Sequence, residues 1–191
     1  MKKPNHSGSG QIRIIGGQWR GRKLPVPDSP GLRPTTDRVR ETLFNWLAPV
    51  IVDAQCLDCF AGSGALGLEA LSRYAAGATL IEMDRAVSQQ LIKNLATLKA
   101  GNARVVNSNA MSFLAQKGTP HNIVFVDPPF RRGLLEETIN LLEDNGRSPD
   151  LCRKRSRKRS AHCSGKLVIT SGKSGGSGGL SAVSTRSTRR K

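Results

Sequence analysis

The sequence has few acidic and few aromatic side chains, and it has no long apolar run. Its 191 residues include 14 Asp and Glu against 30 Lys and Arg, and aromatic residues make up 4% of the chain. No stretch comes near the ~20 apolar residues that a membrane span needs. The polar residues that follow Met1 contain no apolar centre of a secretory signal. We therefore expect a cytoplasmic protein with no membrane partner.

Cysteine is also scarce. The chain has four, and Cys56 and Cys59 form a C-x-x-C pair in an apolar segment that we predict to be a strand. Side chains three residues apart on a strand face opposite sides, and no second pair has the spacing of zinc ligands. We expect reduced thiols and no metal site.

The positive charge is concentrated at the C-terminal end. Residues 147–191 hold 13 Lys and Arg against a single acid, Asp150, together with ten Ser, six Gly and no aromatic residue. Such a segment buries too little surface to offset the entropy of ordering it, so we predict that 147–191 is a disordered basic tail. We hypothesise that it arises from translation in a shifted reading frame. The rival interpretation is a basic RNA-binding arm.

The rest of the chain divides into an extension and an α/β core. Residues 1–10 are expected to be a flexible N-terminus, and 11–54 a basic hairpin and a helix that ends near Leu47. From 55 to 146, short apolar runs alternate with helical stretches, which is typical of a parallel sheet with helices on both faces. The expected strands are 55–60, 78–82, 104–106 and 122–126, and the expected helices are 66–74, 85–99, 110–116 and 134–142.

A glycine-rich turn follows the first strand of this core. Gly62, Gly64 and Gly67 form G-x-G-x-x-G between a strand and a helix, so the backbone can turn tightly and approach a ligand closely. Glu82 ends the next strand, where a carboxylate can accept hydrogen bonds from ribose hydroxyls. The pattern predicts a cofactor that contains adenosine, and the alternative is a tight turn that needs glycine for packing.

Asp58 narrows the choice of cofactor. It lies at the end of the strand, before the glycines, where a carboxylate can take the ammonium of an amino acid. S-adenosylmethionine has such an ammonium and NAD does not. The alternative role for Asp58 is to cap the following turn.

A second motif, Asp127-Pro128-Pro129-Phe130, directly follows another apolar strand. Two prolines stiffen the backbone and remove two donors, which leaves the Asp127 carboxylate and nearby carbonyls as acceptors. Acceptors that hold the hydrogens of an exocyclic amino group favour rehybridisation of its nitrogen and free the lone pair for attack on a methyl group. Phe130 offers a face for base stacking, while the alternative is a Pro-Pro turn with a solvated carboxylate.

With these motifs in place, residues 11 to about 146 resemble a known family. The matching segments are IRIIGGQWRGRKLPVP, RPTTDRVRETLFNWL, LDCFAGSGALGLEAL, LIEMDR and VDPPF. They are similar to the bacterial 16S rRNA guanine-N2 methyltransferases of the small-subunit methyltransferase D family. The resemblance implies a class I, Rossmann-like fold that depends on S-adenosylmethionine. It also implies methyl transfer to N2 of a guanine in 16S rRNA of the assembling 30S subunit, by a chain that we expect to be a monomer.

The resemblance also assigns roles to individual residues. Cofactor contacts fall on Asp58, Gly62 and Gly64, on Glu82 at the ribose, and on Asn109 and Ala110 at the adenine. The target amine is held by Asp127, Pro128, Pro129 and Phe130. Substrate contacts fall on Arg20 and Arg22 of the hairpin and on Arg33, Thr35 and Arg40 of the segment that closes over the site; for Arg33 and Arg40 the alternative is a solvated helix surface.

The chain departs from the family after Gly146, where the family continues with a strand, a helix and a closing hairpin. We expect the sheet to lack about three strands, so that the strand before Asp127 becomes an edge and activity of this chain is in question. Three other functions are weighed against the main one. They are a DNA adenine amino-methyltransferase, a nicotinamide oxidoreductase that uses the glycine turn, and an RNA-binding assembly factor without catalysis.

Overall fold

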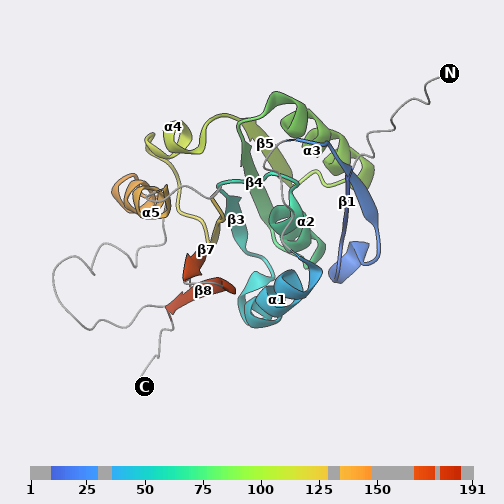
Figure 1. Cartoon of the computed structure of the whole chain (residues 1–191), viewed down its shortest axis with the longest axis horizontal. Coiled ribbons are helices and arrows are strands. Elements are labelled where there is room, and N and C mark those ends of the chain that lie inside the picture. The colour runs from blue at the N-terminus through green and yellow to red at the C-terminus, as the bar shows by residue number, and fades with distance from the viewer. Residues whose placement is uncertain (1–9, 30–35, 129–133, 148–165, 175–176, 186–191) are drawn as a thin grey trace.

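The fold is known from a computed structural model that describes residues 10–29, 36–128 and 134–147, and the backbone of 166–174 and 177–185. Six strands of these segments form one sheet in the order β5-β4-β3-β6-β7-β8 (Figure 1). Its first four strands in this order run parallel, as the alternating pattern predicted. Their bounds are β3 (Gln55–Asp58), β4 (Gly77–Glu82), β5 (Ala103–Asn107) and β6 (Ile123–Val126).

Helices cover both faces of this sheet, as expected. One apolar cluster joins three helices to one face and includes Cys56 and Phe125, while a second joins two helices to the other face and includes Leu57 and Val124. Adjacent residues of β3 and of β6 thus point to opposite layers. The first layer holds α1 (Asp37–Ile51), α2 (Ala65–Ser72) and α3 (Arg85–Leu98), and the second holds α4 (Ala110–Leu114) and α5 (Leu134–Asp144).

Helix α1 continues about one turn beyond the end that we expected at Leu47. It passes through Pro49 and ends at Ile51. Leu47 and Ile51 are both buried in the first apolar cluster. They are four residues apart, so they lie on the same face of the helix. The packing of Ile51 therefore extends the helix past a residue that tends to interrupt one.

The N-terminal extension packs on α2. Strands β1 (Gly10–Arg13) and β2 (Lys23–Val26) form an antiparallel hairpin, with a short helix, η1 (Gly17–Trp19), between them. The fully buried Glu69 of α2 accepts the amides of Ile15 at 2.9 Å and Gly16 at 2.8 Å. Because α2 begins at the glycine turn, the hairpin is fixed to the helix that follows this turn.

The C-terminal segment differs from the sequence-based expectation. Residues Lys166–Ser174 form β7, which pairs in parallel with β6, and Ser177–Thr185 form β8, which pairs antiparallel with β7. The strand before Asp127 is therefore not an edge. Unpaired backbone groups of β6 provide a template for pairing. The tail contains one short apolar run, Leu167-Val168-Ile169, two of whose residues are β-branched, and it lies in register with β6. Residues 148–165 lie outside the described part of the chain.

Candidate functional site

Three carboxylates of the expected site, those of Asp58, Glu82 and Asp127, lie where three neighbouring strands end. The loop that leaves β3 is bonded to both adjacent strands: the Cys59 amide donates to Phe125 at 3.0 Å, and the Ala61 amide donates to Ile81 at 2.9 Å. This loop therefore runs between Glu82, at the end of β4, and Asp127, just after β6. In open parallel sheets, ligands bind outside the carboxyl ends of the strands.

The glycines of the turn meet separate requirements. Gly62 and Gly64 have φ of 51° and 77°, in the left-handed region that favours glycine. A Cβ at Gly64 would also lie 2.5 Å from the side chain of Leu91, and one at Gly67 would lie 3.0 Å from that of Leu80. The first two glycines shape the turn, and Gly64 and Gly67 bring α2 close to its neighbours, so the turn serves both packing and backbone access at the N-terminus of α2.

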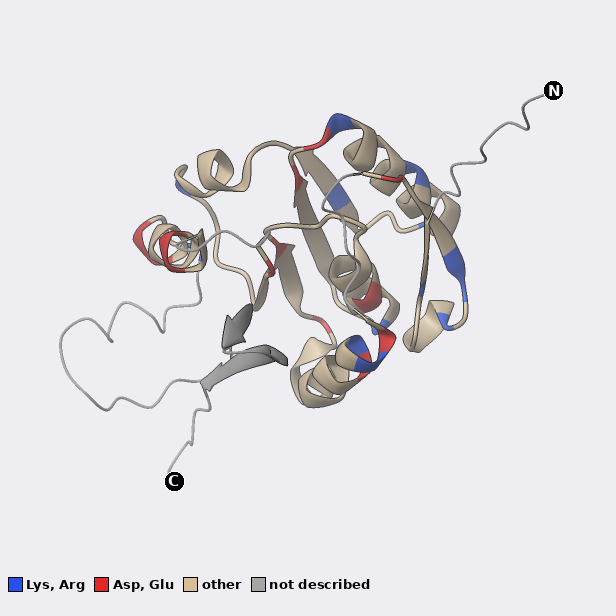
Figure 2. Cartoon of the chain, in the orientation of Figure 1, with Lys and Arg blue, Asp and Glu red and all other residues tan. Residues whose placement is uncertain are grey.

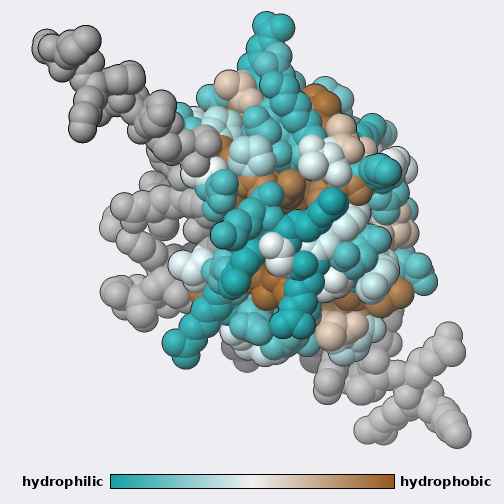
Figure 3. Space-filling view, turned by 90° about the vertical axis from the view of Figure 1, so that its right-hand side faces the viewer, coloured by the Kyte–Doolittle hydropathy of each residue, from teal (hydrophilic) through white to brown (hydrophobic). Residues whose placement is uncertain are grey.

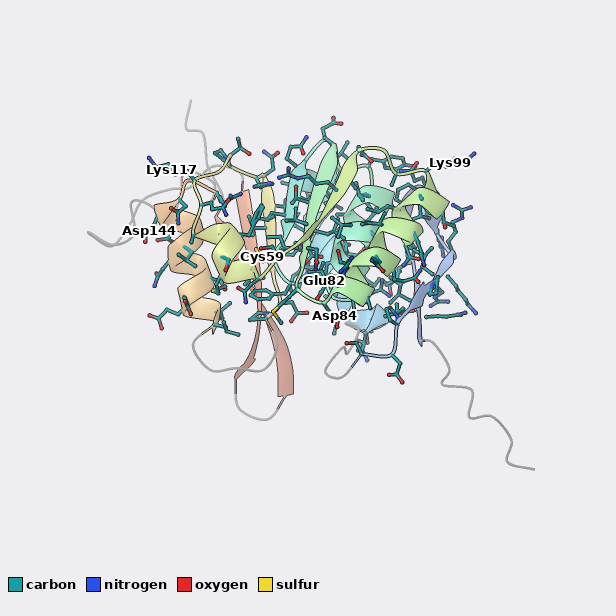
Figure 4. All side chains as sticks on the ribbon, turned by 90° about the horizontal axis from the view of Figure 1, so that it is seen from above. Cys59, Glu82, Asp84, Lys99, Lys117 and Asp144 are labelled. Carbon is teal, nitrogen blue, oxygen red and sulfur yellow. The ribbon has the colours of Figure 1, made fainter. Side chains whose placement is uncertain are left out.

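Glu82 holds this turn in place. One carboxylate oxygen accepts the Gly62 amide at 2.8 Å, and the other accepts the Asp84 amide at 2.8 Å. Each oxygen of an ionised carboxylate has a second acceptor site, so ribose hydroxyls can still be bound. In Figure 4, Glu82 and Asp84 lie together beside Cys59, which belongs to the loop after β3.

Asp58 is buried and only half satisfied. Its side chain is 1% exposed; Oδ2 accepts the Gly67 amide at 3.1 Å, whereas Oδ1 has no hydrogen-bond partner within the described residues. Burial raises the pKa of Asp58 to about 7; the Gly67 amide opposes this shift and the nearby Asp127 carboxylate adds to it. A buried acceptor without a donor is costly, and a cationic N–H donor would relieve that cost. Asp58 therefore fits the ammonium of an amino-acid moiety.

Beside Asn109, which the resemblance assigns to the adenine, lies a residue that the sequence analysis did not single out. Asn109 caps α4, because its Oδ1 accepts the Met111 amide at 2.8 Å, and its Nδ2 lies 3.7 Å from the sulfur of Met83. Met83 follows Glu82 and is 68% exposed. The sequence signal that could have indicated Met83 is the position of an apolar side chain directly after the acidic residue that ends a strand. Ala110, by contrast, is buried.

On the other side of the loop, Asp127 and Pro128 are half-buried after β6. The charge of Asp127 acts on Asp58, so the carboxylates of the two predicted motifs belong to one electrostatic environment. The predicted site residues Pro129, Phe130, Arg33 and Thr35 lie outside the described residues.

The interpretation of Arg40 as a substrate contact needs correction. Its side chain is 2% exposed, and NH2 donates to the Arg13 carbonyl at 2.8 Å and to the Asp37 carboxylate. NH1 lies 3.8 Å from the buried carboxylate of Glu69. A guanidinium held in this way ties α1 to the hairpin and to α2, and it does not face a ligand. Arg20 and Arg22 of the hairpin are exposed.

The cysteine pair lies next to the site. Cys56 and Cys59 are both buried and free, and burial raises the pKa of Cys56 to about 12. The described residues contain no group of three or more side chains that could hold a metal ion. A thiol in such surroundings is unreactive.

Comparison with known proteins identifies the family. Residues 12–157 match the family described as conserved hypothetical protein 95. The Haemophilus influenzae protein named ribosomal RNA small subunit methyltransferase D is 55% identical over 152 residues, which is 76% of this chain and 78% of that protein. The chain belongs to the ribosomal RNA small subunit methyltransferase D family. The matched stretch of this family member contains the hairpin, the glycine turn and the Asp127 motif.

Solved structures have folds similar to that of this methyltransferase D family member. The Escherichia coli protein yhhF is 82% identical with a TM-score of 0.73, over 85% of this chain and 81% of that one. A Thiobacillus denitrificans S-adenosylmethionine-dependent methyltransferase, solved with S-adenosyl-L-homocysteine, is 17% identical with a TM-score of 0.55, over 74% of this chain and 50% of that one. The second likeness concerns the fold alone, which is the class I, Rossmann-like methyltransferase fold. Among the described residues, no helix is long and apolar enough to cross a membrane.

Proposed function

We propose that this chain transfers a methyl group from S-adenosylmethionine to the exocyclic N2 of a guanine in 16S rRNA during assembly of the 30S subunit. The observation that carries the proposal is the meeting of the open Asp58 carboxylate, the glycine turn, Glu82 and Asp127 at the ends of three adjacent strands. A relative that is 55% identical to this chain is named ribosomal RNA small subunit methyltransferase D, and this name supports methylation of small-subunit rRNA. A monomer that acts in the cytoplasm remains our expectation.

The residues of the turn would hold the cofactor, which supplies an electrophilic methyl group on a sulfonium. Asp58 Oδ1 has no hydrogen-bond partner among the described residues and would accept from the ammonium. Glu82 would accept from the ribose, and Met83 and Asn109, which lie together, would line the adenine. The left-handed backbone at Gly62 and Gly64 permits the close approach of a ligand to the main chain.

Asp127 would position the nucleophile. Its carboxylate accepts from the amino group of guanine, so the nitrogen lone pair is directed at the methyl carbon. Transfer would form the N–C bond as the C–S bond of the sulfonium is broken, and the surplus proton on the guanine nitrogen would leave to solvent. The base must leave its stack to reach the site, and the exposed Arg20 and Arg22 would contact the RNA around it, together with Arg33 and Thr35.

The test is methyl transfer to 30S particles that lack the modification, followed by nucleoside analysis for N2-methylguanine. Asp127→Asn is expected to lower the transfer rate about 100-fold or more, because the amide no longer provides two acceptors, while cofactor affinity stays near that of the native protein. Asp144→Asn, at an exposed site on α5, is the matched control and should be fully active.

The outcomes separate the alternatives. Transfer to adenine in duplex DNA, with none to the particles, would replace the proposal with DNA methylation. If Asp127→Asn rescued particle assembly in cells as well as the native protein, and no methyl group were transferred by either, the chain would be an assembly factor without catalysis.

A further inference from the structure

The Lys and Arg side chains of the described residues fall into two groups, paired and unpaired. Arg13, Arg40 and Arg73 are held in salt bridges to Asp37 or Glu69, and Arg104 and Arg147 donate hydrogen bonds. Eight exposed cations make neither kind of contact with another described residue. Six of them lie on the hairpin or on α3 and its C-cap: Arg20, Arg22, Lys23, Arg85, Lys93 and Lys99, with Arg38 and Lys117 elsewhere.

These two elements are distant in sequence but adjacent in space. Asn94 of α3 donates through Nδ2 to the Pro25 carbonyl of β2 at 3.0 Å, and both elements contribute to the same apolar cluster. Lys93 precedes Asn94, and Lys23 lies two residues before Pro25, so both flank the contact. We call the exposed side of β1, η1, β2 and α3 the basic face. Figure 3 views this side of the molecule, where hydrophilic side chains run in bands.

The basic face is also poor in acidic residues. Residues 1–27 and 85–126 contain no Asp or Glu, so the segments that form the hairpin and α3 carry no carboxylate of their own. Exposed acids lie just outside these segments, at Asp28 after β2 and at Asp84 before α3, and three more, Glu136, Glu137 and Asp144, lie on α5 at the far side of the sheet (Figure 2). A merely solvated surface with interspersed signs would not separate the charges in this way.

Like charges also lie opposite each other within the face. Arg13 and Lys23 are partners across the β1–β2 ladder, and like charges in that position destabilise a hairpin. Asp37 balances Arg13, but among the described residues nothing balances Lys23. Lys23 is therefore a cation without a carboxylate partner among the described residues, and a bound polyanion would supply one.

We propose that the basic face, including α3, binds the phosphate backbone of the RNA that flanks the target nucleotide. This inference rests on the function proposed above and extends it beyond the hairpin arginines. Arg85 begins α3 just after Glu82, and Lys99 follows its end; 14 helical residues span about 21 Å. The cations thus lead from the site across the molecule. Backbone contacts of this kind fix the position of a nucleic acid without reading its sequence.

The test compares two charge reversals, Lys93→Glu and Lys117→Glu. Both lysines are exposed and unpaired among the described residues, but Lys117 lies between α4 and β6, at the opposite end of the molecule from Lys99 (Figure 4). Binding of the full chain to an rRNA fragment that contains the target is measured over a range of salt concentrations. Lys93→Glu is expected to weaken binding roughly 3- to 10-fold and to reduce the slope of log K against log salt by about one, whereas Lys117→Glu leaves both near the native values.

Kinetics provide the second measurement. Lys93→Glu should raise KM for RNA and leave cofactor affinity and kcat at saturating RNA unchanged, since a flanking phosphate contact adds binding without touching the reacting atoms. Equal weakening by both variants, or none by either, would overturn the inference while the native protein still methylates RNA. If the native protein methylates no RNA but Lys93→Glu weakens RNA binding and Lys117→Glu does not, the basic face is supported as an RNA-binding surface and the proposed function is refuted.

Discussion

The carboxyl group of Asp58 makes cofactor binding depend on pH in a predictable direction. Burial raises its pKa from the ordinary 3.8 to about 7 in the cofactor-free protein. An ammonium ligand binds to the ionised Asp58 carboxylate. At mildly acidic pH most protein molecules carry a protonated Asp58, so that binding has to remove this proton. Affinity is therefore expected to increase as pH rises through about 7.

The size of the effect follows from the ionised fraction. Half of the cofactor-free molecules carry ionised Asp58 at pH 7, against about 3% at pH 5.5, and the apparent Kd scales inversely with the competent fraction. The affinity for S-adenosylmethionine should therefore fall roughly fifteenfold between pH 7.0 and 5.5. The ammonium of the ligand keeps its proton over this range, since an α-amino group titrates near pH 7.7 to 8.0.

Isothermal titration calorimetry at pH 5.5, 6.0, 6.5 and 7.0, with the native protein and Asp58→Asn, measures this dependence. The amide resembles the protonated acid, so the variant should bind weakly and with little change across the range. A native affinity that varies less than about twofold, or an Asp58→Asn variant with the native pH dependence, would contradict the reasoning.

The same group acts on stability with the opposite sign. A raised pKa in the folded state stabilises the fold fully below pH 3.8, and this contribution is lost as pH rises through about 7. Relative to Asp58→Asn, the unfolding free energy of the cofactor-free native protein should fall by on the order of 3 kcal/mol between pH 5 and 8. Denaturant unfolding of both proteins at the two pH values checks this.

Three further predictions concern the framework of the site. Glu69→Gln should cost about 3 kcal/mol in urea unfolding, because an amide nitrogen would face the backbone donors of Ile15 or Gly16, and because the buried charge that pairs with Arg73 at 2.8 Å and lies 3.8 Å from Arg40 would be lost. Gly17→Ala, whose Cβ would lie 1.8 Å from the Ser72 carbonyl, should lower Tm well beyond Gly21→Ala, which has φ of 82° and open space and is expected to lose only about 1 to 2 kcal/mol; equal shifts would argue against the docked turn. Tyr74→Gly should stabilise by about 1 kcal/mol in thermal unfolding, since the exposed Tyr74 has φ of 69°.

Local pattern was enough to predict the core. Alternating apolar runs and helical periods identified four parallel strands and their helices, with ends displaced by a few residues, because these signals depend on neighbours within one or two turns. The glycine turn could likewise be recognised, since a left-handed backbone at Gly62 and Gly64 needs a particular residue type at those positions. Asp58, Glu82 and Asp127 each stand at the carboxyl end of a predicted strand, and in a parallel sheet these ends share one edge.

Tertiary contacts decided the rest. From the sequence of its helix alone, Arg40 is predicted to be a surface cation. Its burial is stable only because Asp37, Glu69 and the Arg13 carbonyl lie close to it. Pairing with β6 is what turns part of the C-terminal segment into strands. The basic face exists because Asn94 brings α3 against a hairpin some 70 residues earlier. Sequence thus determined which elements of the core form and which chemistry they carry, whereas partners distant along the chain decided which charges are buried, which are left to bind, and that two strands are added after the core.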